Sequence, residues 1–322
     1  MLIDDYFIHQ INFEKKYGSK TIVLMQVGSF FEFYGVNNDQ EKIGDAQKIT
    51  ELLNIQLSRR NKSILENSRT NALMAGFPLN SVKRYINILL TNNYSVVLIE
   101  QTSEPPNPKR EITQIYSPGT YIDEINQYDP NNIISIYITE ETCYKTGKCV
   151  FSFGISCIDL STGSNVIYED SIMYYEKNAF LEEIYRFIES YNPKEIIVNY
   201  NNINKIKIDD IKTRINGVNR IVHYQNNIEK KIFNILYQNT FLKKIFKEHG
   251  ILSPIEYIDM EKKNYALISY IILLEFSYEH NERIIEKIQK PLHWEYNDHL
   301  ILYNNAIYQL NIISNNKDNN LK

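Results

Sequence analysis

Apolar residues along the chain switch between the spacing of amphipathic helices and the alternation of β-strands. In the first part of the chain, this pattern predicts helices at 3–17, 40–51 and 80–92 and strands at 21–27 and 94–100. Helices and strands mixed at this spacing indicate an α/β domain over residues 1–125. The proline-containing segment Asp129-Pro130-Asn131-Asn132 marks its boundary.

Later segments predict a second α/β domain over residues 130–250. Its expected strands lie at 133–139, 150–169, 195–199 and 221–223, with a hairpin turn at Ser161-Thr162-Gly163, and its expected helices lie at 175–191 and 227–248. Residues 255–322 have a helical pattern that is broken at Pro291 and ends in an Asn-rich tail. The fold class expected is therefore a multidomain α/β protein that ends in an all-helical segment.

An aromatic octet follows the first predicted strand: Gly28-Ser29-Phe30-Phe31-Glu32-Phe33-Tyr34-Gly35. Because side chains alternate along a strand, Phe30 and Glu32 are predicted on one face, and Phe31 and Phe33 on the other. One face can pack into a core, and the other then presents an aromatic ring beside a carboxylate. This pairing suits a wedge that enters a base stack. The alternative is an ordinary core strand with a solvated glutamate.

Charge is unevenly distributed along the chain. The net charge of −4 argues against a surface covered by DNA, because phosphate binding requires cations. Residues 59–110, however, hold eight Lys and Arg against three Asp and Glu. Arg59, Arg60 and Lys62 lead this basic region, which is either a phosphate-binding surface or an ordinary solvated one.

Cys143, Cys149 and Cys157 have no companion histidine, so we expect free thiols and no metal site. No apolar stretch reaches the ~20 residues of a membrane span, and we expect an intracellular protein without a membrane partner.

Five segments resemble, in order, the mismatch-recognition region of the MutS family of DNA mismatch-repair proteins. They are Leu24–Tyr34 with its Phe-x-Glu motif, Leu52–Arg60, Met74-Ala75-Gly76-Phe77-Pro78, the strand Val96–Gln101, and Arg110-Glu111-Ile112 with Ser117-Pro118-Gly119-Thr120. Ser29 stands where the family more often has Asp. For the Met74–Pro78 segment, core packing is the preferred interpretation.

The resemblance implies a mismatch-recognition domain, a ribonuclease-H-like connector domain, and the start of the helical lever domain. It also implies that Phe30 inserts from the minor groove of mismatched DNA while Glu32 contacts the displaced base. Arg59, Arg60 and Lys62 would contact the DNA backbone. The protein partners that the resemblance implies are a MutS-type dimer partner or other repair proteins, reached through the connector.

The phosphate-binding pattern Gly-x-x-x-x-Gly-Lys-Ser/Thr does not occur in the sequence. The resemblance therefore implies an N-terminal portion of MutS, with the ATPase and clamp regions beyond Lys322. We expect no enzyme activity and no cofactor in this chain; ATP and Mg²⁺ are expected only for a full-length family member.

Two alternatives use the second domain. Asp159 lies near the position of the first metal-binding carboxylate in ribonuclease-H-like nucleases, which suggests a metal-dependent nuclease, although two-metal chemistry needs further converging carboxylates. Its ordinary role would be to begin the turn at Ser161-Thr162-Gly163. The other alternative is a docking module with no role in DNA binding.

Overall fold

The structure is a computed structural model, and it describes residues 2–59, 61–64, 66–104, 106, 108–121, 130–142, 147–173, 177–203, 207–216, 220–280, 282 and 287–295. Its contacts divide the chain into Met1–Leu292 and His293–Lys322. Arg60, Cys143 and residues 296–322, which include the Asn-rich tail, lie outside the described residues.

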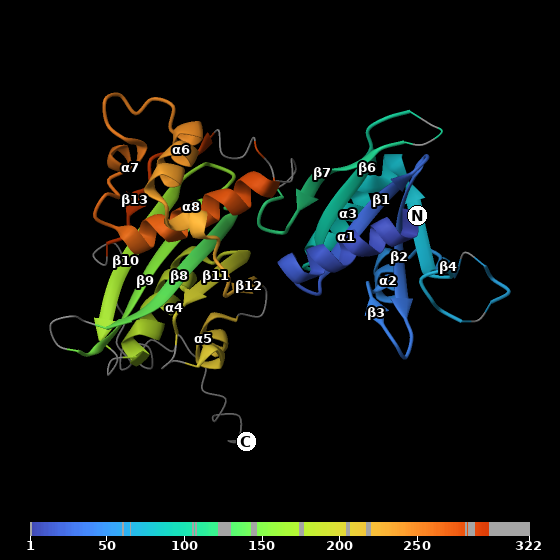
Figure 1. Ribbon diagram of the computed structural model, residues 1–322, viewed down its shortest axis with the longest axis horizontal. Coiled ribbons are helices and arrows are strands. Elements are labelled where there is room, and N and C mark those ends of the chain that lie inside the picture. Colours follow the sequence, from blue (N-terminus) through green and yellow to red (C-terminus); the bar gives the residue numbers. More distant parts are fainter. Residues whose placement is uncertain are drawn as a thin grey trace, which may run out of the picture. The chain divides into compact units, whose positions relative to one another are not determined.

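The first sheet has seven strands: β1 (Thr21–Val27), β2 (Phe30–Asn37), β3 (Lys42–Ile43), β4 (Ser58–Arg59), β5 (Leu73–Pro78), β6 (Ser95–Gln101) and β7 (Arg110–Tyr116). Their order is β4-β5-β2-β1-β6-β7, with β3 paired to β2 (Figure 1). Strands β1 and β6 are parallel, and the other pairs are antiparallel. The predicted strand at 21–27 is confirmed to the residue.

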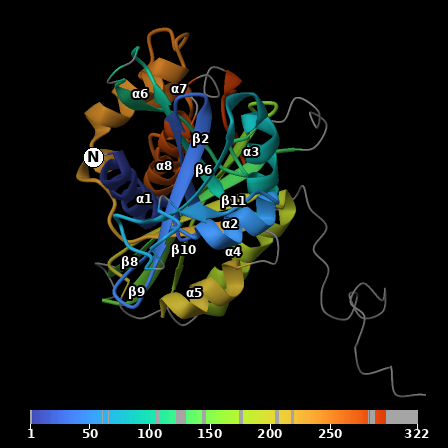
Figure 2. The same cartoon turned by 90° about the vertical axis from the view of Figure 1, so that its right-hand side faces the viewer.

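Helices cover both faces of this sheet (Figure 2). They are α1 (Leu2–Tyr17), α2 (Ala46–Leu53) and α3 (Val82–Thr91), which follows the 3₁₀ turn η1 (Leu79–Ser81). On one face, Tyr6 of α1 packs edge-on against Tyr34 of β2, with 4.9 Å between ring centroids. On the other, Tyr85 of α3 lies 4.3 Å from the ring of Phe77 in β5. Both faces of β2 therefore contribute to the core.

The second sheet has the order β12-β11-β8-β9-β10-β13. Its strands are β8 (Asn132–Thr142), β9 (Cys149–Asp159), β10 (Asn165–Met173), β11 (Glu195–Asn201), β12 (Ile221–Gln225) and β13 (Leu292–His293). Strands β8, β9 and β10 form an antiparallel meander, and β11 lies parallel to both β8 and β12. Helices α4 (Lys177–Tyr191) and α5 (Ile208–Ile215) follow β10 and β11; α5 has no counterpart among the predicted elements.

Strand β9 shows how sequence alternation positions the helices of this sheet. Phe151 and Phe153 point to one face, where both rings contact Phe180 of α4. Gly154 and Ser156 point to the other, where helix α8 (Asn264–His280) packs. A Cβ atom on Gly154 would lie 2.1 Å from the backbone of Tyr265, so only glycine allows this close approach. Large residues thus face α4, and small residues face α8.

Two features of the C-terminal half differ from the predicted elements. The expected single helix at 227–248 is a 3₁₀ turn, η3 (Lys230–Phe233), followed by α6 (Ile235–Ile245). The break occurs because the Asn234 side chain accepts hydrogen bonds from two backbone amides of the first turn of α6. After the short α7 (Pro254–Tyr257), helix α8 joins the core of the second sheet, which the pattern did not predict. The boundary expected between residues 250 and 255 stays a prediction.

Within the described residues, no helix is both long and apolar enough to cross a membrane.

Candidate nucleic-acid interface

A two-residue turn, Gly28-Ser29, connects β1 to β2, with Val27 paired to Phe30 at its base. Gly28 has a left-handed φ of +59°. Positive φ at the first central residue, and not at the second, is the requirement of a type II′ hairpin turn, and it favours glycine there. The backbone N–H of Leu79 donates to the Ser29 carbonyl oxygen at 3.1 Å, which ties the turn to the end of β5. The start of β2, at Phe30, is therefore fixed by its pairing with β1 and by the hydrogen bond between Leu79 and the turn.

The alternation predicted for the aromatic octet is confirmed. Phe31 and Phe33 are only 2% and 1% exposed, whereas Phe30 is 44% exposed. Glu32 is half-buried on the same face as Phe30. Leaving this ring in solvent forgoes its burial, which for a phenylalanine stabilises by about 1.5–3 kcal/mol. An aromatic side chain exposed beside two buried ones is typical of a contact surface.

Tyr34 holds the carboxylate of Glu32. Its hydroxyl donates a hydrogen bond to Glu32 Oε2, two residues away on the same face. Burial raises the pKa of Tyr34, and the bond to Glu32 raises it further, so the hydroxyl stays a donor. Across the strand pair, Gly76 lies opposite Glu32, and a Cβ atom there would come within 3.1 Å of Glu32 Cγ and 2.7 Å of the Phe31 carbonyl oxygen. Gly76 thus leaves room for the glutamate. We call Phe30, Glu32 and Tyr34 the wedge face.

The Met74–Pro78 segment forms β5, and its Ala75 and Phe77 are buried. Its preferred interpretation as a packing segment is therefore confirmed. Gly76 adds a role that the sequence interpretation had missed, the space beside Glu32.

Of the basic residues, Arg59 is half-buried in β4 and Lys62 is exposed in the loop that follows. The buried side chain of Asn71 organises this loop: its Oδ1 accepts from the Asn61 backbone at 2.8 Å, and its Nδ2 donates to the carbonyl oxygens of Ile64 and Glu66, both at 3.1 Å. Asn71 therefore fixes the backbone at Asn61, Ile64 and Glu66, and Lys62 is exposed between the first two of these residues.

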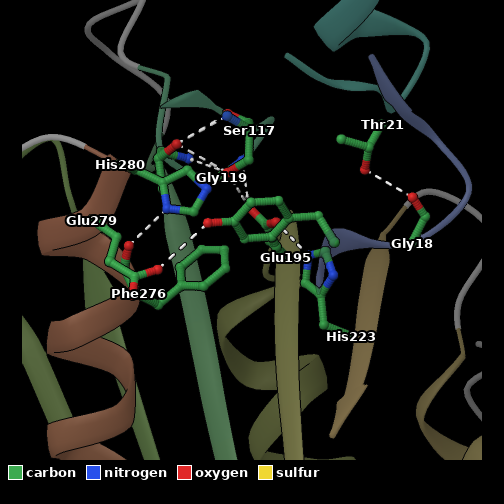
Figure 3. Close-up of polar contacts among 11 residues, drawn as sticks. Gly18, Thr21, Ser117, Gly119, Glu195, His223, Phe276, Glu279 and His280 are labelled. Carbon is green, nitrogen blue, oxygen red and sulfur yellow. Dashed lines mark hydrogen bonds and ion pairs between the residues drawn. The ribbon is translucent and has the colours of Figure 1, made fainter. Parts of the chain in front are cut away.

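A second set of polar residues surrounds Glu195, at the start of β11 (Figure 3). Glu195 Oε2 accepts from Ser117 Oγ at 2.6 Å and from the Gly119 backbone at 3.1 Å, and its Oε1 lies 2.6 Å from Nε2 of His223. These hydrogen bonds outweigh burial and keep the pKa of Glu195 below its ordinary value. We call the segment Ser117–Tyr121, which follows β7, the linker. Glu195 fixes the linker through these hydrogen bonds.

Asp159 has the structural role that was the ordinary alternative. Its carboxylate accepts from the backbone amides of Asn131 and Ser161 and from the hydroxyl groups of Ser161 and Thr162, at 2.6–3.0 Å. These bonds lower the pKa of Asp159 despite its partial burial. The carboxylate of Glu169 accepts hydrogen bonds from the backbone amides of Tyr265 and Ala266. Among the described residues, no group of three His, Cys, Asp or Glu side chains is placed to hold a metal ion. The contacts of Asp159 therefore favour a turn-forming role over a nuclease site.

Comparison with known proteins adds the class of the first sheet: residues 7–125 match the family model described as MutS domain I. A protein of Acanthamoeba polyphaga mimivirus, named as a DNA mismatch repair protein mutS homolog, is 31% identical over 97% of this chain. The DNA mismatch repair proteins MutS of Borreliella burgdorferi (strain ZS7) and Halothermothrix orenii are 32% and 26% identical over 59% and 94% of it. The chain belongs to the MutS family. It spans 29%, 19% and 30% of the lengths of these three relatives.

Proposed function

We propose that this chain recognises mismatched double-stranded DNA in DNA mismatch repair, and that it does so with the wedge face. The observation that carries the proposal is the exposed Phe30, set beside a held glutamate on a strand whose other aromatic side chains are buried. The names of the relatives, which are DNA mismatch repair proteins, support the same role.

In this proposal Phe30 enters the minor groove beside the mispaired base and kinks the duplex. Unstacking one base step costs about a few kcal/mol. A mismatch has already lost part of its pairing and stacking, so it deforms at a lower cost than a paired step. Discrimination then arises from the deformability of the DNA, and no base sequence needs to be read.

Glu32 contacts the displaced base. An ionised carboxylate only accepts hydrogen bonds, so it pairs with a base N–H group. Tyr34 occupies Oε2 of Glu32, which directs the remaining acceptor, Oε1, to the base. Glu32 thus supplies one oriented contact beside the inserted ring.

Arg59, Arg60 and Lys62 contact the phosphate backbone in this proposal. Such contacts position the protein on the duplex without reading its sequence. The hydrogen bonds from Asn71 to Asn61 and Ile64, on either side of the exposed Lys62, support the part assigned to Lys62.

We also infer that the second sheet is a ribonuclease-H-like connector domain. The antiparallel meander of β8, β9 and β10, followed by the parallel strands β11 and β12 on the other side of β8, supports this assignment. The lever domain expected from residue 255 onward stays a prediction, because helix α8 and strand β13, which lie in that range, pack with the second sheet.

The test is binding of the chain to a duplex with one mismatch and to its fully paired twin, at low salt. Wild type is expected to prefer the mismatch, and Phe30→Ala is expected to bind both duplexes equally. Phe233→Ala is the matched control, because Phe233 is 40% exposed but lies in η3. Equal preference in wild type and Phe30→Ala would refute the wedge.

One observation favours the docking alternative for the second domain. Ile235 and Leu236, consecutive residues at the start of α6, are 69% and 75% exposed. Exposed apolar side chains grouped in this way are typical of protein interaction sites. If the chain self-associates through them, its sedimentation coefficient will rise with concentration, and Leu236→Asp will abolish the rise. A coefficient independent of concentration would exclude a second copy as the occupant.

A further inference from the structure

The backbone of Gly28, two residues before Phe30, is held at both of its polar groups. Its carbonyl oxygen accepts a hydrogen bond from Nε2 of Gln26 at 3.1 Å. With the amide oxygen of Gln101, the last residue of β6, turned toward Gly28, the Gly28 N–H donates to Oε1 of Gln101 at 3.3 Å. The opposite orientation gives up the bonds from Gly28 and Arg110 for a single bond from Nε2 to the Gln26 carbonyl oxygen at 3.3 Å, so the first orientation satisfies more donors. An exposed two-residue turn would ordinarily give these groups to water. Here protein side chains take them.

The two glutamines are joined to each other. Gln26 Oε1 accepts a hydrogen bond from the backbone N–H of Gln101 at 2.9 Å. The side chain of Gln26 thus connects the end of β6 to the turn, because its amide accepts from one and donates to the other.

Arg110, the first residue of β7, completes the arrangement. Its Nε donates to the carbonyl oxygen of Gln26 at 3.1 Å, and its Nη2 donates to Oε1 of Gln101 at 3.0 Å. The planar guanidinium can make both bonds at once, which the single ammonium of a lysine cannot do in the same geometry. We call Gln26, Gln101 and Arg110 the brace.

We propose that the brace is a specificity-determining element: Gln101 and Arg110 fix the Gly28-Ser29 turn and thereby hold Phe30 in the position for insertion. The inference rests on the proposed recognition of mismatched DNA. Gln101 and Arg110 act through the turn and are positioning residues. A fixed turn has lost its conformational freedom before DNA arrives, so binding does not have to order the wedge.

This arrangement predicts a change in discrimination more than in affinity. Phosphate contacts supply most of the affinity for any duplex and do not depend on where the ring points. Insertion at a mismatch does depend on it. Loss of one brace hydrogen bond is expected to lower the ratio of mismatched to paired affinity by about three- to tenfold.

Substitutions at Gln101 separate the brace from simple packing. Gln101→Met keeps the size of the side chain and loses the acceptor, so the ratio should fall and the Gly28 amide should exchange with solvent about three- to tenfold faster. Gln101→Glu keeps an acceptor for both donors, so the ratio should be retained. The added negative charge should lower affinity for both duplexes by the same factor.

Arg110→Lys keeps the positive charge but loses the planar guanidinium that makes both hydrogen bonds. The ratio of mismatched to paired affinity should therefore fall, while the salt dependence of binding is unchanged. Gln114→Met is the matched control, because Gln114 is an exposed residue of β7 that contacts Tyr116. It should leave both the ratio and the exchange of Gly28 at their wild-type values.

The experiment measures the affinity ratio of the full chain and the hydrogen exchange of the Gly28 amide for all five proteins. A lower ratio with faster exchange in Gln101→Met, and rescue of both by Gln101→Glu, supports the proposal. If the wild type prefers the mismatch and the Gln101→Met and Arg110→Lys variants keep the wild-type ratio, the proposed role of the brace is refuted. The proposed function is then unaffected. A wild type without preference overturns the proposed function and the role of the brace in recognition together.

Discussion

Glu32 and Glu195 are two glutamates held by hydroxyl groups, and their surroundings differ in every other respect. Glu195 is fully buried, and both of its oxygens have partners within the protein. Glu32 is half-buried, its described partner is Tyr34, and it stands beside an exposed aromatic ring. One carboxylate has all of its partners in the interior, whereas the other lies at the surface beside an exposed ring.

The linker contributes to the stability of the fold, whereas the wedge face is available for binding. At the linker, polar groups are removed from water and matched to one another, so any change there should be felt as lost stability. At the wedge face, an apolar ring is left in water, and changes to it should be felt in binding.

The largest expected effect comes from two neighbouring phenylalanines. Phe31→Ala should lower the free energy of unfolding by about 3–5 kcal/mol, because it empties a fully buried site. Phe30→Ala should change it by less than about 1 kcal/mol, because the ring is exposed. Urea unfolding of both variants checks this. Similar losses in the two variants would contradict the division between core and wedge.

Glu195→Gln should destabilise the chain by about 1–3 kcal/mol, because the bonds from Ser117, Gly119 and His223 lose their charged acceptor. It should leave the mismatch preference of the folded protein unchanged. Glu248→Gln is the control, because Glu248 is exposed, and it should lie within about 0.5 kcal/mol of wild type. Unfolding curves and duplex binding of the same samples decide whether the buried glutamate serves stability alone.

Acidification should lower the stability of the second sheet through His280, a buried residue of α8 that lies near Glu195. Burial lowers the pKa of His280 below its ordinary 6.5. As the pH falls through 6.5, the unfolded chain takes up a proton that the folded chain refuses, so stability is lost. The slope is at most about 1.4 kcal/mol per pH unit and should be reduced in His280→Gln but not in His249→Gln. Unfolding curves between pH 7.5 and about pH 5 measure it. An unchanged slope in His280→Gln would refute this assignment.

The smallest expected effect is that of Lys62→Ala. It should weaken binding to mismatched and paired duplexes by the same factor and reduce the slope of log affinity against log salt by about 1. Titrations at several salt concentrations test this. Loss of affinity for the mismatch alone would place Lys62 among the residues that discriminate.

Local features of the fold could be predicted from the sequence because they depend on neighbours in the chain. The alternation from Phe30 to Phe33 and the strand at 21–27 follow from period-two burial, and the structure confirms both. The single helix expected at 227–248 was wrong because Asn234 caps a new helix inside an otherwise helical pattern. A capping side chain and a mid-helix asparagine look alike in sequence.

The contacts that organise the candidate site could not be predicted, because they join distant parts of the chain. Ser117 and Glu195 are 78 residues apart, and Gln26 and Gln101 are 75 apart. The sequence pointed to the Ser117–Thr120 segment and to the end of β6 as motifs, but it carried no signal of what they contact. The contact of Tyr34 with Glu32 could have been predicted from the sequence, because the two residues are two positions apart on the same face of a strand.

The most direct test of the central claim is the stacking of a fluorescent base next to a mismatch. 2-Aminopurine placed there brightens when a neighbouring side chain unstacks it. Addition of the wild-type chain should raise its fluorescence, and a Phe30→Ala chain at a saturating concentration should not; Phe233→Ala should behave as wild type. Equal brightening by wild type and Phe30→Ala would show that the duplex is opened without Phe30 and would contradict the account.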